Sequence, residues 1–276
     1  MLNLDSLVFV AFLSLCFNAA ASGSDTKTRV SLQGDAIQGG LMIGKADADL
    51  QSVLLGTVKV PVHPNKRLFV FGFGRDAKKE DTLSIEFMDG QVESHAISVA
   101  QRDYKIDRVE GVASKYVSPP QSVLDRIRKE SLAVKDARAK LSYRLDFTQA
   151  VVQPAQGRIS GVYGSQRVFN GVPKRPHFGM DIAAPTGTPV IAPWSGKVVL
   201  AEPDLYYSGG TLIIDHGLGV TSTYIHLSKL HVKVGEEITQ GQDIAAIGAT
   251  GRVTGPHLDW RLNWFSRRLD PALLLK

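Results

Sequence analysis

The stretch HFGMDIAAPTGTPVIAPWSGKVV, residues 177–199, opens the region whose pattern decides the fold. Glycine and proline recur through it and onward to about residue 260, at intervals that interrupt helical periodicity. The short apolar segments between these breakers are residues 198–200, 212–214 and 244–247. Since no helix of ordinary length fits between 160 and 262, we predict a compact, mostly antiparallel β domain over residues 155–272.

Residues 30–110 show a second β pattern, and we predict a small sandwich-like domain there. Apolar residues alternate with others over 58–62 and 83–87. Period-two patterns interrupted by glycine and aspartate at short intervals are typical of antiparallel sandwiches. Because His63 and His95 stand alone in this region, we expect no catalytic group of residues in it.

Between the two β regions, the periodicity changes to that of a helix. The apolar residues at helical spacing are Leu124, Ile127, Val134, Ala137 and Leu141. Ser118-Pro119-Pro120 precedes this run and marks its start. We predict a helical connector over 119–145 that joins or clamps the two β domains, with a charge pattern that serves solubility.

The first 21 residues, MLNLDSLVFVAFLSLCFNAAA, contain an apolar run with small residues at its end, as in a signal peptide. The run is too short to span a bilayer comfortably. Asp5 stands where a signal peptide usually carries a positive charge, and a buried amino-terminal strand is the alternative interpretation. We predict export with cleavage near Ala21 and a periplasmic location, with secretion as the alternative.

Cys16 is the only cysteine of the chain and lies within the predicted signal, residues 1–21. Leu15 before it is bulky, whereas a lipoprotein signal needs a small residue there, so we do not predict lipidation. The exported chain would then contain no cysteine. Its stability would depend on its core, because no disulfide could form.

The net charge limits the classes of partner. The chain carries +5, and loss of Asp5 with a signal that contains no lysine or arginine would raise this to +6. Such a balance suits an anionic matrix such as cell wall or a membrane surface. Nucleic acid is the rival partner, but the basic residues are scattered and form no dense basic helix, so no nucleic acid is predicted.

Histidines concentrate in the carboxy-terminal half, at positions 177, 216, 226, 231 and 257. His177 and Asp181 stand four residues apart in a turn-to-strand segment that can bring both side chains to one metal ion. Strand alternation places His257 and Asp259 on one face of a further strand. Imidazole and carboxylate suit Zn²⁺, and three protein ligands with one open position is the catalytic arrangement.

A third strand adds another histidine to this set. Alternation predicts that Tyr224 and His226 share one face of that strand. Zinc lowers the pKa of a bound water and polarises a peptide carbonyl. A histidine beside the metal can orient the water or donate a hydrogen bond to the developing oxyanion.

Residues 157–273 resemble the lysostaphin and LytM-type zinc endopeptidases, which cut peptide bonds in peptidoglycan. The resemblance is carried by residues 177–199 and by GGTLIIDHGLGVTSTYIHLSKLHVKVGEEITQGQDIAAIGATGRVTGPHLDW, residues 209–260. It implies the antiparallel β fold of that family, which is duplicated-hybrid-motif-like and has a groove across its sheet. It also implies that the substrate is a stem or cross-link peptide of peptidoglycan.

The resemblance further implies roles for single residues. His177 and Asp181 match two zinc ligands, and His226 and His257 match histidines that assist catalysis. The third ligand of the family is the second histidine of a H-x-H pair, and that position holds Asp259 here.

Asp259 leaves two interpretations open. Its carboxylate can replace imidazole at zinc, which would give a nearly neutral site and a weaker Lewis acid. Alternatively, zinc is weak or absent and the groove only binds peptide. Because four of the five expected side chains remain, we predict an active enzyme. The alternative is a degenerate peptidoglycan-binding module that regulates or activates another cell-wall hydrolase.

Several other residues receive narrower predictions. Tyr163 and Arg167 precede His177 and are candidates for lining the substrate groove, with core packing and solvation as the alternatives. His216 is interpreted as structural and His231 as a surface strand residue.

The remaining predictions concern packing and partners. Trp260 and Trp264 are spaced as strand residues that point away from the site, so we predict them in the core. The amino-terminal half resembles, more loosely, β-rich domains that precede such catalytic domains in exported wall enzymes of Gram-negative bacteria. This likeness assigns no residue role, but it leaves wall-associated or membrane-associated regulators as candidate partners.

Overall fold

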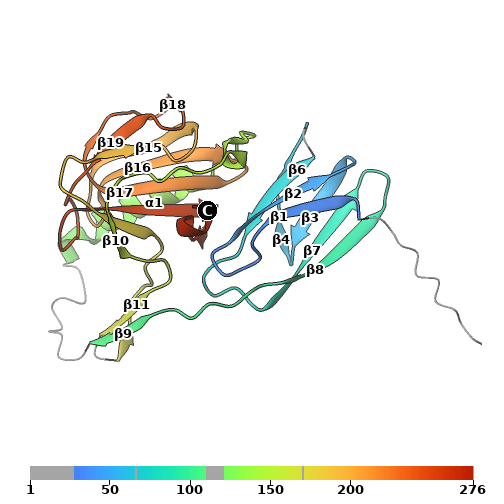
Figure 1. The fold of residues 1–276 in the computed structure, drawn as a ribbon, viewed down its shortest axis with the longest axis horizontal. Helices are drawn as coiled ribbons and strands as arrows, with labels where there is room; N and C mark the ends of the chain where they lie inside the picture. Colours follow the sequence, from blue (N-terminus) through green and yellow to red (C-terminus); the bar gives the residue numbers. More distant parts are fainter. Residues whose placement is uncertain (1–27, 66, 110–120, 170, 276) are drawn as a thin grey trace, which may run out of the picture.

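Two β domains make up most of the molecule, which is described from a computed structural model (Figure 1). The structure describes residues 28–65, 67–109, 121–169 and 171–275. The predicted export signal, residues 1–21, lies outside the described residues. In the described part of the chain, no helix has the length and apolar character needed to cross a membrane.

The amino-terminal domain consists of two four-stranded antiparallel sheets. In strand order, the first sheet contains β1 (Val30–Gly34), β2 (Leu41–Ala46), β6 (Leu68–Gly72) and β5 (Val62–His63). The second contains β4 (Val58–Lys59), β3 (Leu50–Leu55), β7 (Glu80–Phe87) and β8 (Val92–Ser98). Apolar side chains from both sheets share one buried core, among them Val53, Phe69, Phe71, Leu83 and Ile85. This agrees with the predicted sandwich-like domain.

The alternating run 58–62 is divided between two strands in different sheets. β4 ends at Lys59, and β5 begins at Val62 in the other sheet. Pro61 lies between them and has no backbone N–H to continue a ladder. The Val60 N–H instead donates to the Val53 carbonyl at 2.9 Å. The proline therefore ends one strand, and the chain crosses from the second sheet to the first.

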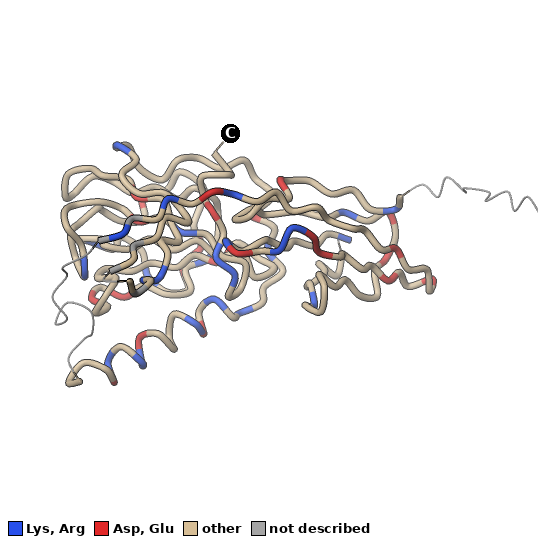
Figure 2. The backbone as a smooth tube through the Cα atoms, turned by 90° about the horizontal axis from the view of Figure 1, so that it is seen from below, with Lys and Arg blue, Asp and Glu red and all other residues tan. Residues whose placement is uncertain are grey.

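The connecting segments include a small sheet and the predicted helix. β9 (Ile106–Val109) pairs in parallel with β11 (Gln166–Phe169), which pairs with β12 (Val172–Pro173). A 3₁₀ turn (Gln121–Val123) leads into α1 (Leu124–Ala139), and further 3₁₀ turns occupy Asp146–Thr148 and Pro271–Leu274. The helix lies within the predicted connector, but Leu141 follows its end and is exposed. Both signs of charge occur along α1 (Figure 2).

The carboxy-terminal domain is one ten-stranded sheet, and its strand pairs are antiparallel, as predicted. Its main path runs through β10 (Arg158–Gly161), β13 (Met180–Ala183), β20 (His257–Trp264), β17 (Val220–Leu230), β16 (Gly209–Gly217), β15 (Gly196–Leu205) and β18 (Glu237–Ile238). β14 (Pro189–Ile191), β19 (Asp243–Ile247) and β21 (Arg267–Leu269) pair beside this path. Trp260 and Trp264 are 0% and 1% exposed, which confirms their predicted place in the core.

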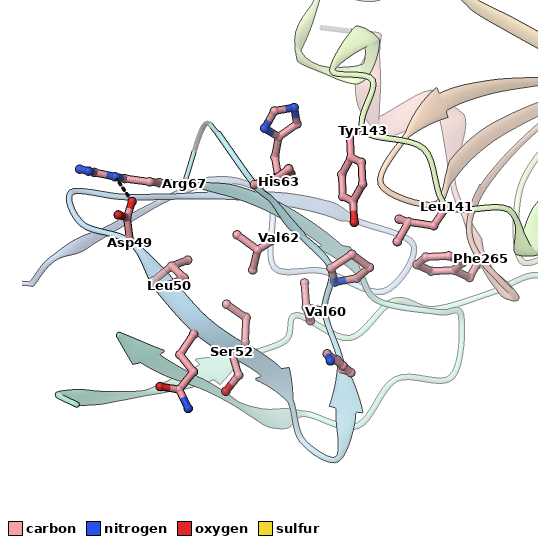
Figure 3. A pocket seen from close by; sticks show the side chains of 15 residues that line it. Asp49, Leu50, Ser52, Val60, Val62, His63, Arg67, Leu141, Tyr143 and Phe265 are labelled. Atoms are coloured by element: carbon pink, nitrogen blue, oxygen red, sulfur yellow. Dashed lines mark hydrogen bonds and ion pairs between the residues drawn. The ribbon is translucent and has the colours of Figure 1, made fainter. Parts of the chain in front are cut away.

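The two domains are in direct contact. Leu262, Trp264 and Leu269 join the same buried cluster as the aromatic core of the amino-terminal sandwich. Beside this contact lies a cavity of about 560 Å³, and two of its lining residues, His63 and Tyr143, lie next to each other (Figure 3). The rings of these two residues meet edge to face with centroids 6.0 Å apart. His63 therefore has a packing role at the domain boundary.

Candidate metal centre

The pairing of β13 with β20 brings two acidic residues together. Asp181 and Asp259 are direct partners in the antiparallel register, and directly opposed side chains lie on the same face of a sheet. His177 precedes β13 by a short turn. Its Nε2 atom lies 3.0 Å from Asp181 Oδ1 and 3.3 Å from Asp259 Oδ2. One ligand atom from each residue falls within 4.8 Å of the other two. We call these three residues the acid cluster.

The free atoms of the acid cluster fit a divalent cation. His177 Nε2 and Asp181 Oδ1 are buried and have no hydrogen-bond partner of acceptable geometry in the described structure. The Nδ1 atom of His177 lies 3.2 Å from the Val162 carbonyl, so Nδ1 carries the proton and Nε2 can offer its lone pair. One imidazole nitrogen and two carboxylate oxygens form a donor set that zinc accepts.

Two glycines leave room for the carboxylates. A Cβ atom at Gly161 would lie 2.2 Å from Asp181 Oδ2, and a Cβ atom at Gly179 would lie 2.1 Å from Asp259 Oδ1. Both separations are far shorter than any real contact, so a side chain at either position would push a carboxylate away. The glycine in the H-F-G-M-D motif is therefore needed because the backbone approaches Asp259 closely.

His226 and His257 lie together beside the acid cluster. Their ring centroids are 4.8 Å apart, and His257 Nε2 lies 3.9 Å from Asp181 Oδ1. His226 Nδ1 lies 2.9 Å from the Thr250 carbonyl, and His257 Nδ1 lies 2.8 Å from the Gly255 carbonyl. A carbonyl can only accept, so Nδ1 is the donor in both rings, and Nε2 is the nitrogen left for chemistry.

The prediction that Tyr224 and His226 share a strand face was wrong. Tyr224 lies in the hydrophobic core, while the His226 ring meets His257 on the site face. The register of β17 against β16 contains one extra β17 residue between Tyr224 and Leu227, which is a β-bulge. His226 has φ of 68°, a left-handed conformation that is uncommon outside glycine. The bulge interrupts the alternation and turns the imidazole toward the site.

Arg261 is a residue of this site that sequence reasoning did not identify. Its Nε atom lies 3.0 and 3.1 Å from the two Asp259 oxygens, and a terminal nitrogen lies 2.5 Å from Oδ2. Such a forked contact is the strongest form of a charged hydrogen bond. The signal was available, because Asp259 and Arg261 are two residues apart on a strand and so share a face.

The electrostatics of the acid cluster favour positive charge. Burial tends to lower the pKa of His177, but its contacts with Asp181 and Asp259 raise that pKa to about 10. Burial tends to raise the pKa of Asp259, but the charges of Arg261 and His177 hold it well below its usual range. Burial lowers the pKa of His226, so this imidazole is neutral at pH 7. A site that holds a proton on His177 so firmly also favours a metal cation in its place.

The other predicted residues lie outside the acid cluster. Tyr163 is 2% exposed, packs against Phe178, and donates its hydroxyl to the Arg268 carbonyl at 2.8 Å. This burial matches the core-packing alternative rather than a groove lining. Arg167 belongs to β11, but its side chain lies outside the described part, so its predicted role stays a prediction.

The two remaining histidines of the domain differ in burial. His216 is buried, with its nitrogens 2.7 Å from the Ser195 carbonyl and 2.7 Å from the Ser222 hydroxyl. It is structural, as predicted. His231 is exposed and lies 2.9 Å from Asp243, just after β17 ends rather than within a strand.

Comparison with known proteins places this site in a family. Residues 175–271 match the model of peptidase family M23. The chain is 34% identical over 200 residues to peptidoglycan DD-endopeptidase ShyA of Vibrio cholerae serotype O1, which covers 69% of this chain and 41% of ShyA. It is 41% identical over 105 residues to lysostaphin of Staphylococcus simulans, which covers 36% of this chain and 21% of lysostaphin. The matched region is thus less than half the length of these relatives.

A solved structure resembles the chain over a longer span. A crystal structure from Pseudomonas aeruginosa, described as a peptidase M23, matches with a TM-score of 0.67 and 27% identity. The match covers 87% of this chain and 95% of that one. The likeness therefore extends beyond the carboxy-terminal domain.

Proposed function

The carboxy-terminal domain is a member of the lysostaphin/LytM-type peptidases, family M23, and from this premise we propose that the chain is a zinc endopeptidase acting on peptidoglycan. The observation that carries the proposal is the convergence of one imidazole and two carboxylates on a small volume with open ligand atoms. The similarity to ShyA supports a stem or cross-link peptide as the substrate, since that relative is named a peptidoglycan DD-endopeptidase.

His177, Asp181 and Asp259 would hold the metal ion. When bound, zinc would polarise the scissile carbonyl and acidify a water molecule. His226 and His257 stand beside the acid cluster with Nε2 free. As a neutral imidazole, His226 can accept a proton or donate a hydrogen bond. His226 and His257 would therefore transfer the proton of the attacking water and stabilise the negative charge that develops on the carbonyl oxygen.

Arg261 offsets the additional negative charge that Asp259 brings to the metal centre. Two carboxylates would cancel the charge of a divalent ion and weaken its action as a Lewis acid. The Arg261 guanidinium contacts both oxygens of Asp259 and returns one positive charge to the centre. It also holds the Asp259 carboxylate in one orientation, so we assign it a positioning role.

The proposed substrate lies outside the cytoplasm, so the proposal includes export. It rests on the apolar run and small residues within positions 1–21 of the sequence. A periplasmic location follows from that run and from the wall substrate together, with secretion as the alternative.

A second candidate function is favoured by the same Arg261 contact. If the guanidinium occupies Asp259 so fully that zinc does not bind, the domain would be a peptide-binding module that regulates another wall hydrolase. The two candidates differ in whether the purified protein holds zinc.

The test combines zinc content with cleavage. We would measure zinc by elemental mass spectrometry and identify fragments released from purified sacculi, with and without chelator, for the natural chain and His177→Ala. The enzyme proposal expects bound zinc and chelator-sensitive fragments for the natural chain and neither for the variant. Equal zinc in both proteins, with no fragments from either, would contradict it.

A further inference from the structure

A second cavity lies between α1 and the site face of the sheet. Its volume is about 790 Å³, and α1 contributes one wall. Its other lining residues include Arg175, Phe178, Ser208, Asn263 and Arg268. We call it the arginine pocket because Arg138 of α1 also lines it.

The arginine pocket contains guanidinium groups without carboxylate partners among the described residues. Arg138 is 7% exposed. Within the described residues its side chain donates one hydrogen bond, to the Thr223 hydroxyl at 2.9 Å, and its Nε has no partner. Arg268 bonds the neutral Asn263 side chain at 3.2 Å. Arg175 lies over the Phe178 ring, with its guanidinium carbon 5.8 Å from the centroid. Buried charges are normally paired, so this wall lacks an anion.

The acidic residue that lines the arginine pocket, Glu130, is already paired with groups other than its arginines. Glu130 lines the pocket, but its carboxylate contacts Arg126 at 2.6 Å and accepts from the Tyr206 N–H at 2.8 Å. Burial and the charges of Arg261 and Arg175 lower the pKa of Arg268 to about 9. The arginines thus repel one another, and among the described residues Asp259 offsets this repulsion only in part.

The arginine pocket adjoins the metal centre. Asp259 and Asn263 share one face of β20, four residues apart, which corresponds to about 13 Å along a strand. The Ser208 carbonyl accepts from the His226 N–H at 2.8 Å. Phe178 directly follows His177 in the sequence. A peptide lying across the metal centre can therefore reach the pocket with a nearby side chain or chain end.

We propose that the arginine pocket binds a carboxylate of an acidic peptide while a peptide bond of the same molecule lies at the metal centre. Guanidinium groups match carboxylates in charge and in their forked hydrogen-bond geometry. The inference rests on the proposed function and adds to it a selection for acidic peptides. The three arginines come from α1, from the segment before His177 and from β21, so a ligand there contacts three separate parts of the chain.

The test measures binding in chelator, so that neither zinc nor cleavage is needed. Calorimetric titration of the full chain uses muropeptides released from sacculi, and the same muropeptides after amidation of their carboxyl groups. We expect amidation, Arg268→Gln and Arg138→Gln each to weaken binding at least about tenfold. Arg175→Gln removes an exposed guanidinium, so it tests the pocket even if a buried variant fails to fold.

Arg128→Gln is the matched control, because Arg128 is an exposed residue of α1 that pairs with Asp125 on the same helix. It should bind like the natural chain. Unchanged binding by folded Arg175→Gln and Arg268→Gln, or indifference to amidation, would overturn the inference. Inorganic phosphate binding as tightly as the muropeptide would also overturn it, since the pocket would then take any small anion. If the protein binds muropeptides in this test but holds no zinc when it is prepared without chelator, the enzyme proposal fails and the inference about the arginine pocket stands.

Discussion

The two faces of β20 are both buried, yet they differ in chemistry. Leu258, Trp260 and Leu262 are fully buried apolar residues, and we call their side the apolar face. Asp259 and Asn263 are 2% and 0% exposed on the opposite side, which we call the polar face. On the apolar face only the Trp260 indole N–H, which faces the Tyr224 hydroxyl, calls for a partner, and burial stabilises the fold through the area removed from water. Burial on the polar face requires a partner for every charge and donor.

This difference between the two faces indicates that ligands bind on the polar face. On the polar face, Arg261 supplies the partner of Asp259 from within the chain. His177 Nε2 and Asp181 Oδ1 lie 3.0 Å apart without a well-aligned hydrogen bond, and Arg138 Nε is buried with no hydrogen-bond partner among the described residues. These atoms mark a cation site and an anion site side by side, whereas the apolar face only stabilises the sheet. Substitutions on the two faces should therefore affect different measurements.

Asp181→Asn tests the polar side with the largest expected effect. It removes a ligand charge while keeping the side-chain shape. Zinc affinity should fall at least about a hundredfold and sacculus cleavage at least about a thousandfold. The free energy of unfolding in chelator should change by less than about 1 kcal/mol. Zinc competition with a chelating dye, fragment analysis and urea unfolding measure the three quantities. Full cleavage by this variant would remove Asp181 from the centre.

Trp260→Ala tests the apolar face. Loss of this fully buried indole should lower the free energy of unfolding by about 4 kcal/mol, because it leaves a cavity in a close-packed core. Urea unfolding in chelator measures this value, and Trp260→Phe should lose less. A loss below about 1 kcal/mol would contradict the separation of the two faces.

Arg261→Gln tests whether Arg261 is the residue that neutralises the buried Asp259 carboxylate. The variant leaves a buried carboxylate without its partner, so unfolding in chelator should be easier by about 3 kcal/mol. The double variant Asp259→Asn/Arg261→Gln removes both charges and should be more stable than Arg261→Gln alone. If the double variant is the less stable protein, the two residues do not act as a pair.

His216 provides a contrast to the histidines of the metal centre, because both of its ring nitrogens have partners within the chain. Burial lowers its pKa to about 4 in the folded protein, while an unfolded histidine titrates near ~6.5. Between these values only the unfolded chain takes up the proton, so stability should fall by roughly 2 to 3 kcal/mol as the pH drops from about 6.5 to about 4.

The pH effect is measured by urea unfolding across that range. His216→Gln should reduce the slope, because no imidazole remains to titrate at that position, while His226 still contributes. His231→Gln is the control, since His231 is exposed and its loss should leave the slope in place. An unchanged slope in His216→Gln would place the titrating group elsewhere.

Much of the carboxy-terminal domain was predictable because its signals are local. Glycine and proline spacing indicated short antiparallel strands, and alternation placed Trp260 in the core. The H-x-x-x-D and H-x-D spacings identified three side chains that the structure brings together. These features depend on neighbours within a few residues, which a sequence displays directly.

Other features resisted prediction because they depend on pairing between distant strands. A bulge turns His226 away from the face of Tyr224. Tyr163 was a groove candidate, but contacts with Phe178 and Arg268 bury it. Pro61 splits a run that alternates well, since the missing N–H matters only where a neighbouring strand needs it.

By itself, the sequence determined the two β regions, the helix between them and the residue types able to bind a metal ion, because strand and helix periods are properties of adjacent residues. Only the tertiary structure decided that Asp259 is paired with Arg261 and that Arg138, Arg175 and Arg268 line one pocket. The physical reason is that burial and charge pairing depend on strand register and on how α1 packs against the sheet. Both are set by contacts between residues far apart in the chain.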